Sequence, residues 1–271
     1  MHIEKYLLNE ALSLSEAPNP RVFEVAKELS GVTAGAGINF RLHGSSGIRA
    51  KLARALTILD RAKRQPKDVD GVILSEDREK LRKLLLSSGW LENVELTARS
   101  EGSRMRFAIP KERLVLDISV DALDFARRLD LRNRINLDWP TIPGADLLLG
   151  KLQIPRLSRG DIIDCVALLG GLAPTPGNES EINLDRLVEV ASLSWRWYQA
   201  TSLSLATIRD AAHGNEVDVT EDERNLVVSR IEDILSTIHR ARKGVFWRLR
   251  AVIGDGLPWQ TEVDTISDWP H

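Results

Sequence analysis

Apolar and polar residues alternate along several short segments of the first half of the chain, which is the pattern of β-strands with one buried face. The clearest segment is RLVLDISV at residues 113–120, where every second residue is apolar and Asp117 falls on the opposite face. Further strands are predicted at 38–43, around 68–70, and at 94–98, 104–109 and 135–137. The first half of the chain is therefore expected to contain a small mixed sheet.

Apolar residues at helical spacing predict helices before, between and after these strands. The helices are expected at 1–19, 20–29, 48–59, 76–88, 144–152, 161–169, 184–211 and 221–253, the last of which is long enough to be a pair. Residues 31–37 are expected to form a loop, and Pro140 and Pro143 interrupt the chain before its second half. We predict an α+β fold with two domains, residues 1–143 containing the sheet and residues 144–271 being mainly α-helical.

The composition is that of a soluble globular protein, with 271 residues of which 43% are hydrophobic and 28% are charged. No stretch is as apolar as a membrane helix, so we expect no membrane partner and a cytoplasmic location. The net charge of −2 indicates no general attraction to nucleic acid. From Arg41 to Lys67, however, eight Lys and Arg residues stand against a single acid, Asp60. That segment is either a solvated helix face or a surface for phosphate or RNA.

Two classes of site are excluded by the residues present. Cys165 is the only cysteine, which rules out an intramolecular disulfide and a Cys-rich zinc site, and its apolar neighbours predict a buried thiol. The segment from Gly44 to Gly47, which reads GSSG, lacks the G-x-S-x-G spacing of a serine hydrolase. His43 beside it is therefore expected to be a packing residue rather than a general base.

The triplet Asp68-Val69-Asp70 is the strongest candidate for a metal site. Residues two apart on a strand point to the same face, so both carboxylates can bind one divalent cation. Asp117 projects from a strand that we expect to lie beside this one. Three carboxylates from two strands suit a pair of Mg²⁺ or Mn²⁺ ions that activate a hydroxyl and neutralise a nucleoside triphosphate. This chemistry is nucleotidyl transfer.

A candidate phosphate site lies upstream of the acids. The strand predicted at 38–43 leads into Gly44, Ser45 and Ser46, and a helix is expected to follow. A small-residue turn leaves backbone N–H groups accessible beside the positive end of a helix, where a phosphate is bound by hydrogen bonds and the helix dipole together.

In their order and separation, HGSSG, RQPKDVDG, LDISVD, ADLLLGKLQI and RGDIID resemble the motifs of polymerase-beta-type nucleotidyltransferases related to the abortive-infection and toxin–antitoxin toxins of bacteria. Residues 38–169 carry the resemblance. It implies an α/β nucleotidyltransferase core within residues 1–143, followed by a helical C-terminal domain. It also implies a cytoplasmic transferase that moves an NMP from an NTP to a hydroxyl of RNA or tRNA, a protein or a small molecule, with a cognate antitoxin as a further partner.

The resemblance also implies roles for individual residues. Gly44, Ser45 and Ser46 match the phosphate-binding turn, Asp68 and Asp70 match the metal-binding pair, and Asp117 matches the third carboxylate, which deprotonates the acceptor. The phosphate-binding turn and the metal ligands agree with the assignments made above from the residues themselves.

Three residues of the helical region complete the implied site. Lys151 matches a lysine that contacts the triphosphate, although an ordinary surface lysine is the alternative. Asp161 and Asp164 match the acids of the next motif, and their i, i+3 spacing puts them on one helix face. Asp161 could equally serve only as a partner of the helix dipole.

A second function stays open. A non-catalytic module could keep the nucleotidyltransferase fold as a nucleotide-binding or protein-interaction domain. Against this alternative, three converging acids without a cation would repel one another and destabilise the fold.

Overall fold

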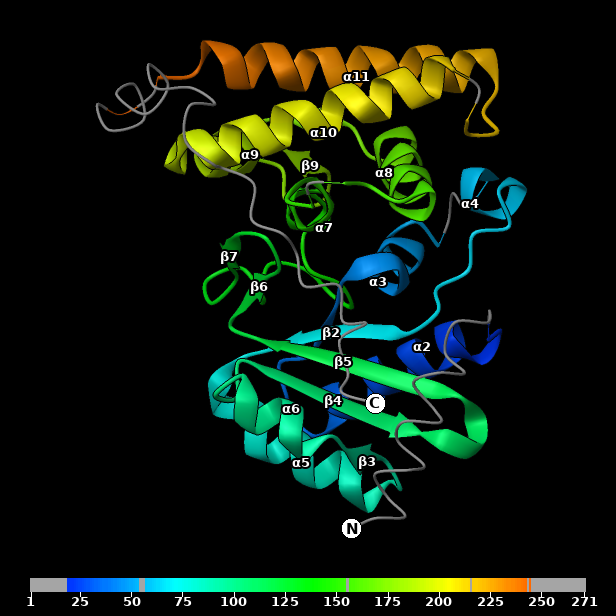
Figure 1. The fold of residues 1–271 in the computed structure, drawn as a ribbon, viewed down its shortest axis with the longest axis vertical. Coiled ribbons are helices and arrows are strands. Elements are labelled where there is room, and N and C mark those ends of the chain that lie inside the picture. Colours follow the sequence, from blue (N-terminus) through cyan, green and yellow to red (C-terminus); the bar gives the residue numbers. More distant parts are fainter. Residues whose placement is uncertain (1–18, 54–56, 155, 215, 243, 245–271) are drawn as a thin grey trace. The chain divides into compact units, whose positions relative to one another are not determined.

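The computed structural model describes residues 19–53, 57–154, 156–214, 216–242 and 244 (Figure 1). They form two compact units: unit 1 holds the described residues up to Leu123 together with 129–143, and unit 2 holds 124–128 and the described residues from Gly144 onwards. Residues 1–18 of the helix predicted at 1–19, and residues 243 and 245–253 of that predicted at 221–253, lie outside the described residues.

Unit 1 is built on a five-stranded mixed sheet in the order β1-β2-β5-β4-β3. The strands are β1 (Arg41–Leu42), β2 (Val69–Ile73), β3 (Leu91–Glu92), β4 (Arg104–Ile109) and β5 (Leu114–Val120). β2 and β5 are parallel, whereas the other neighbouring strands are antiparallel. The predicted α+β class and small mixed sheet are therefore confirmed.

The helices of unit 1 are α2 (Arg21–Gly35), α3 (Gly44–Lys51), α4 (Thr57–Arg61), α5 (Arg78–Ser87) and α6 (Val94–Arg99), with 3₁₀ turns η1 (Ser75–Asp77) and η2 (Pro110–Glu112). Apolar residues of α2 and α5 form one buried cluster with alternate residues of the strands, among them Val69, Phe107 and Leu116. Because side chains alternate across a strand, the neighbours Asp70, Arg106 and Asp117 point to the opposite face. The core thus decides which face of the sheet carries the charged groups.

Two short segments were predicted as strands but are not. Val94–Arg99 forms the helix α6, because the Asn93 side chain accepts a hydrogen bond from the backbone N–H of Leu96 (3.0 Å) and caps a helical turn. Residues 135–137 lie in turns, with the backbone N–H of Ile135 bonded to the carbonyl of Leu131 (2.9 Å). In both cases a local hydrogen bond prevails over weak apolar alternation.

Two other boundaries also differ from the prediction. The segment 31–37 is helical as far as Gly35, and the buried Thr33 hydroxyl is hydrogen-bonded to the Leu29 carbonyl (2.6 Å) within the continuing helix. The helix predicted at 48–59 corresponds to α3, which begins earlier and ends at Lys51, and to α4.

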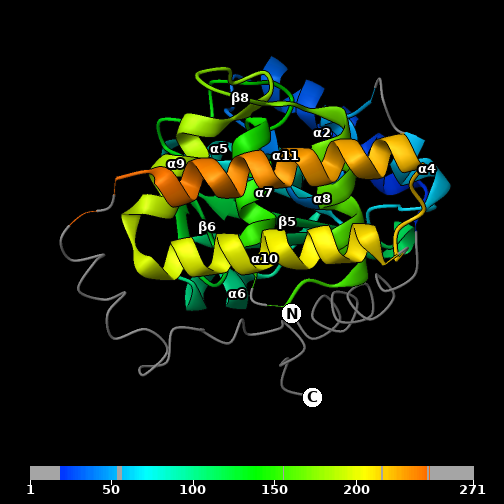
Figure 2. The ribbon, with the colours of Figure 1, turned by 90° about the horizontal axis from the view of Figure 1, so that it is seen from above.

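Unit 2 is mainly helical, as predicted, with α7 (Gly144–Leu152), α8 (Arg159–Gly171), α9 (Leu184–Leu193), α10 (Trp195–His213) and α11 (Glu221–Arg240). All nine residues of α7 are buried, so this helix is the centre of the unit. The apolar positions Val227, Ile231, Ile234 and Ile238 line the buried face of α11. Figure 2 shows α10 and α11 running alongside each other in opposite directions.

The helix predicted at 184–211 is divided at Ser194, whose extended backbone ends α9. Its side chain accepts a hydrogen bond from the Trp197 N–H (3.2 Å) and so begins α10. The remaining strands are short pairs, β6 (Ala122–Asp124) with β7 (Arg128–Asp130) and β8 (Pro174–Thr175) with β9 (Ile182–Asn183).

Buried charges of the central helix α7 are paired within unit 2. Asp146 has no exposed surface and accepts a hydrogen bond from Nε of Arg186 on α9 (2.9 Å).

Cys165 on α8 is buried and makes no disulfide, as predicted, and burial raises the pKa of its thiol. Among the described helices, none combines the length and the apolarity needed to cross a membrane.

Candidate functional site

Three carboxylates converge on the face of the unit 1 sheet opposite α2 and α5. Asp70 of β2 and Asp117 of β5 are register partners in the parallel strand pair. Asp68 lies one residue before β2, rather than within the strand as predicted. One carboxylate oxygen from each residue lies within 4.8 Å of the other two, and all three side chains are half-buried. The structure therefore brings the three predicted metal ligands together.

The segment GSSG forms the first turn of α3, not a loop before it. Gly44 has φ of +57°, and a Cβ atom at this position would lie 2.0 Å from Oδ2 of Asp70. The backbone N–H of His43 donates to the Asp70 carbonyl (3.0 Å). Glycine is therefore required at position 44 for two reasons, the left-handed backbone and the close approach of the Asp70 carboxylate.

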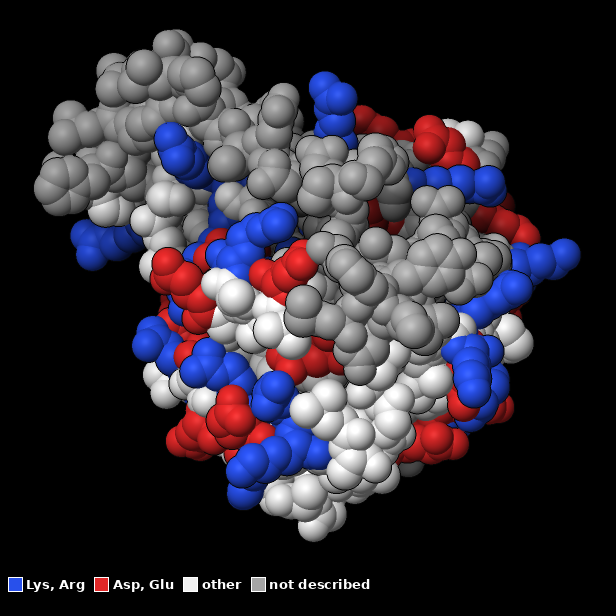
Figure 3. Space-filling view, turned by 60° about the horizontal axis from the view of Figure 1, so that its bottom comes forward, with Lys and Arg blue, Asp and Glu red and all other residues white. Residues whose placement is uncertain are grey.

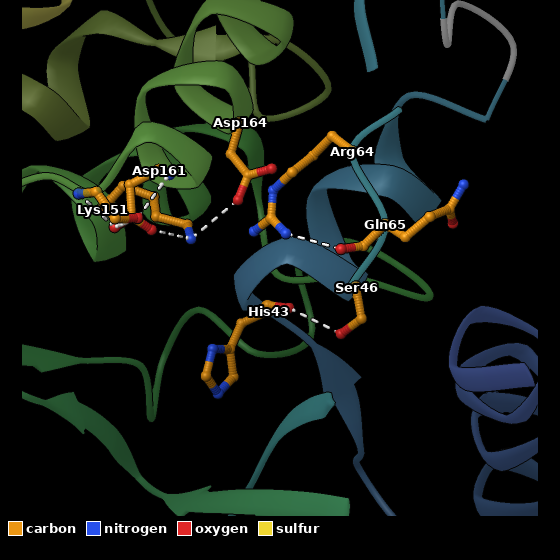
Figure 4. A network of polar contacts seen from close by, with 8 residues as sticks. His43, Ser46, Arg64, Gln65, Lys151, Asp161 and Asp164 are labelled. Carbon is orange, nitrogen blue, oxygen red and sulfur yellow. Dashed lines mark hydrogen bonds and ion pairs between the residues drawn. The ribbon is translucent and has the colours of Figure 1, made fainter. Parts of the chain in front are cut away.

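The hydroxyl of Ser46 forms hydrogen bonds with backbone groups of unit 1. It donates to the His43 carbonyl (3.2 Å), as Figure 4 shows, and accepts from the Asp70 N–H (3.2 Å). Ser45 is buried. The first N–H groups of a helix have no partner within the helix. A phosphate at this turn would consequently be bound by the backbone N–H groups of α3 rather than by the Ser46 side chain.

Arg106 was not identified from the sequence, yet it lies directly beside the three acids. It is the register partner of Asp117 across the antiparallel strands β4 and β5. Its Nε and Nη2 donate to the two carboxylate oxygens of Asp117 at 2.6 and 2.7 Å. The side chains of Arg106 and Asp117 are only 7% and 15% exposed. Arg106, Asp117 and Asp70 therefore form one row across three neighbouring strands.

The charge of Arg106 is strongly favoured at this position. Burial lowers the pKa of its guanidinium, but the carboxylates of Asp117, Asp68 and Asp70 outweigh burial and raise this pKa above the ordinary value. A two-pronged guanidinium–carboxylate pair also fixes the plane of the Asp117 carboxylate. The charge of Arg106 thus partly offsets the repulsion among the three acids.

The other predicted site residues form a cluster of their own in unit 2, drawn in Figure 4. Nζ of Lys151 on α7 lies 2.7 Å from Oδ1 of Asp161 and 3.0 Å from Oδ2 of Asp164, both on α8. Burial lowers the pKa of Lys151, but Asp164 and Asp161 outweigh it and raise this pKa. The alternative of an ordinary surface lysine is wrong, because Lys151 is buried. Contact with a triphosphate stays a prediction, and the ammonium is already bound by two carboxylates.

Asp161 also begins the helix α8. Its Oδ2 accepts hydrogen bonds from the backbone N–H (3.1 Å) and hydroxyl (2.7 Å) of Ser158, while its own N–H donates to the Ser158 hydroxyl (3.2 Å). This is a capping box. Asp161 therefore joins two functions, helix capping and the ion pair with Lys151.

Some of the basic residues between Arg41 and Lys67 form ion pairs within unit 1. Nη2 of Arg49 lies 3.0 Å from Oδ1 of Asp60, and Lys51 is 2.5 Å from Asp138. On the face drawn in Figure 3, blue and red side chains of the described residues are intermingled. Lys63 and Lys67 remain exposed.

Comparison with known proteins gives no relative: no protein-family model, no curated protein and no solved structure matches the chain.

We predict that Gly44→Ala destabilises the protein more than Gly37→Ala does. Both glycines have positive φ, but nothing lies within 4 Å of a Cβ atom at Gly37. The control variant should lose roughly 1–2 kcal/mol from backbone strain alone. Gly44→Ala should lose roughly 1–3 kcal/mol more, because the Asp70 carboxylate must move. Chemical denaturation measures both, and equal losses would contradict the close approach.

The stability contributed by Asp161 should depend on pH. Burial raises the pKa of Asp161, but Lys151 and Ser158 outweigh it and hold this pKa below the ordinary value. The ionised carboxylate therefore stabilises the fold above the pKa of the unfolded chain, and this stability is lost as pH falls through the lower folded pKa.

Asp161→Asn should accordingly be about 1–3 kcal/mol less stable than the wild type at neutral pH. The difference should close in acid. Asp210→Asn removes an exposed carboxylate beside Arg209 and is the matched control, expected to change stability by less than about 0.5 kcal/mol. Denaturation curves at several pH values give the comparison, and a difference that is constant with pH would rule out the ion pair as its source.

Proposed function

We propose that the protein is a Mg²⁺- or Mn²⁺-dependent nucleotidyltransferase, which moves an NMP from an NTP to a hydroxyl acceptor. The observation that carries the proposal is the convergence of the Asp68, Asp70 and Asp117 carboxylates within 4.8 Å, immediately beside the first turn of α3. An acidic cluster and a helix N-terminus in contact supply, respectively, ligands for cations and N–H donors for phosphate.

The donor set fits a hard divalent cation. Mg²⁺ and Mn²⁺ prefer carboxylate oxygens, and Mg²⁺ is usually bound by one or two carboxylates together with substrate phosphates. Asp70 is positioned by its strand, with Gly44 leaving room for its carboxylate, and Asp117 is held by Arg106. When bound, the cation would supply Lewis-acid activation of the acceptor hydroxyl and charge compensation for the triphosphate.

Other groups of unit 1 would bind the phosphates and orient the metal ligands. The backbone N–H groups at the start of α3 would hold phosphate oxygens beside Asp70. Both oxygens of Asp117 accept hydrogen bonds from Arg106. This arrangement favours an oriented ligand over the proton acceptor that the resemblance implies. The acceptor class remains open among RNA or tRNA, a protein and a small molecule, and a cognate antitoxin remains part of the proposal.

One observation favours the non-catalytic alternative. Because Arg106 is paired with Asp117, one of the three carboxylates is balanced without any metal. The three acids therefore require a bound cation less strongly than the sequence alone indicates. A nucleotide-binding or protein-interaction module with the same fold would tolerate this row, and the two functions differ in whether a nucleotide is transferred.

Nucleotidyl transfer should be lost in the double variant Asp68→Asn/Asp70→Asn. The purified protein is incubated with each α-labelled nucleoside triphosphate, Mg²⁺ or Mn²⁺, and total cellular RNA. Label should enter RNA or protein with the wild type and with the control Asp124→Asn/Asp210→Asn, whose exposed acids lie in unit 2. The double variant should stay folded and be at least as stable without metal, since like-charge repulsion is removed.

Equal labelling by Asp68→Asn/Asp70→Asn would refute the role of these acids. Absence of label with every nucleotide, together with metal-dependent nucleotide binding, would instead support the non-catalytic module.

A further inference from the structure

Arg106 makes a direct ion pair with one of the proposed metal ligands, Asp117. It lies on β4 beside Asp117 and is held there by two charge-assisted hydrogen bonds of 2.6 and 2.7 Å. It is one of the few buried arginines among the described residues. Burying a guanidinium is costly unless it is paired, so its position is set by the acids it faces.

The pair leaves part of Asp117 available. A carboxylate has about four lone-pair positions on its two oxygens, and the arginine fork takes one on each. Each oxygen can still face a second cation. Arg106 therefore does not replace a metal ion at Asp117 but reduces by one unit the negative charge that the ion would meet.

We propose that Arg106 is a positioning residue with two effects, orienting Asp117 as a ligand and weakening the binding of divalent cations by the protein alone. The positive charge of Arg106 repels a divalent cation, and the anionic phosphates of a triphosphate that enters with the ion offset this repulsion. Metal binding is thereby coupled to the triphosphate. The inference rests on the metal site of the proposed function.

The first consequence concerns charge. Arg106→Gln removes the internal cation and should bind Mn²⁺ about tenfold more tightly without nucleotide, because a unit charge a few ångströms away strongly affects a divalent ion. Loss of a merely structural residue would distort the site and weaken Mn²⁺ binding. The direction of the change therefore separates the two roles.

The second consequence concerns orientation. Arg106→Lys keeps the charge but loses the planar fork. Its affinity for Mn²⁺ should stay within about threefold of the wild type, since the unit charge that the ion meets is retained. Its kcat for transfer should fall, because the Asp117 carboxylate is no longer fixed in one plane. This variant also keeps the proposal testable if Arg106→Gln does not fold.

Arg104→Gln is the matched control. Arg104 lies on the same strand and the same face, but its register partner is Ser119 rather than an acid. Removing its charge should alter Mn²⁺ affinity much less than removing that of Arg106. Asp117→Asn completes the series and should bind Mn²⁺ most weakly, because it removes a ligand and leaves Arg106 in place.

The experiment is a titration of the full chain with Mn²⁺, followed by electron paramagnetic resonance of the free ion, with and without a non-hydrolysable nucleoside triphosphate. The proposal expects the affinity order Arg106→Gln, then wild type and Arg106→Lys, then Asp117→Asn. It also expects the nucleotide to tighten Mn²⁺ binding less in Arg106→Gln than in the wild type. If the wild type binds Mn²⁺ and Arg106→Gln binds Mn²⁺ no more tightly than the wild type does, the inference alone is overturned. No Mn²⁺ binding by any variant, with or without nucleotide, would overturn the inference and the proposed metal site together.

Discussion

The pairing of β5 with its two neighbours is the constraint on which the candidate site depends. On one side, the parallel register places Asp117 beside Asp70, and on the other, the antiparallel register places it beside Arg106. A shift of either strand by one residue would move its charged side chain to the opposite face, among the apolar residues packed against α2 and α5. The same burial that stabilises the core therefore fixes which carboxylates meet. Asp70, Asp117 and Arg106 therefore come together as a consequence of strand pairing and core packing.

Both units bury charge, but they balance it differently. In unit 2, Lys151 is held by two carboxylates, and Asp146 is held by Arg186. These groups join helices through ion pairs whose partners are supplied by the fold. In unit 1, the Arg106 guanidinium pairs with Asp117, and the carboxylates of Asp68, Asp70 and Asp117 converge on one another. This convergence of carboxylates is the physical basis of the proposed nucleotidyl transfer.

Much of this arrangement could be predicted from local pattern. Strong alternation located β4 and β5 closely, and the D-x-D triplet with Asp117 was found because period-two spacing places such residues on one face. Even Arg106 was accessible in principle, since a hairpin that turns at Pro110–Glu112 pairs it with Asp117. Other features depend on contacts distant in sequence. The need for glycine at position 44 follows from the Asp70 carboxylate, and the burial of Lys151 follows from the packing of α7 at the centre of unit 2.

The central claim is that Asp68, Asp70 and Asp117 bind a divalent cation. The most direct test is a crystal structure of the protein with Mn²⁺ and a non-hydrolysable nucleoside triphosphate, with anomalous scattering used to locate the metal. The account predicts an anomalous peak within about 2.0–2.6 Å of carboxylate oxygens of these residues, the range of hard-cation coordination. Phosphate oxygens should complete the coordination beside the first turn of α3. A nucleotide bound elsewhere, or a row of acids that holds no metal while Arg106 stays paired with Asp117, would contradict it.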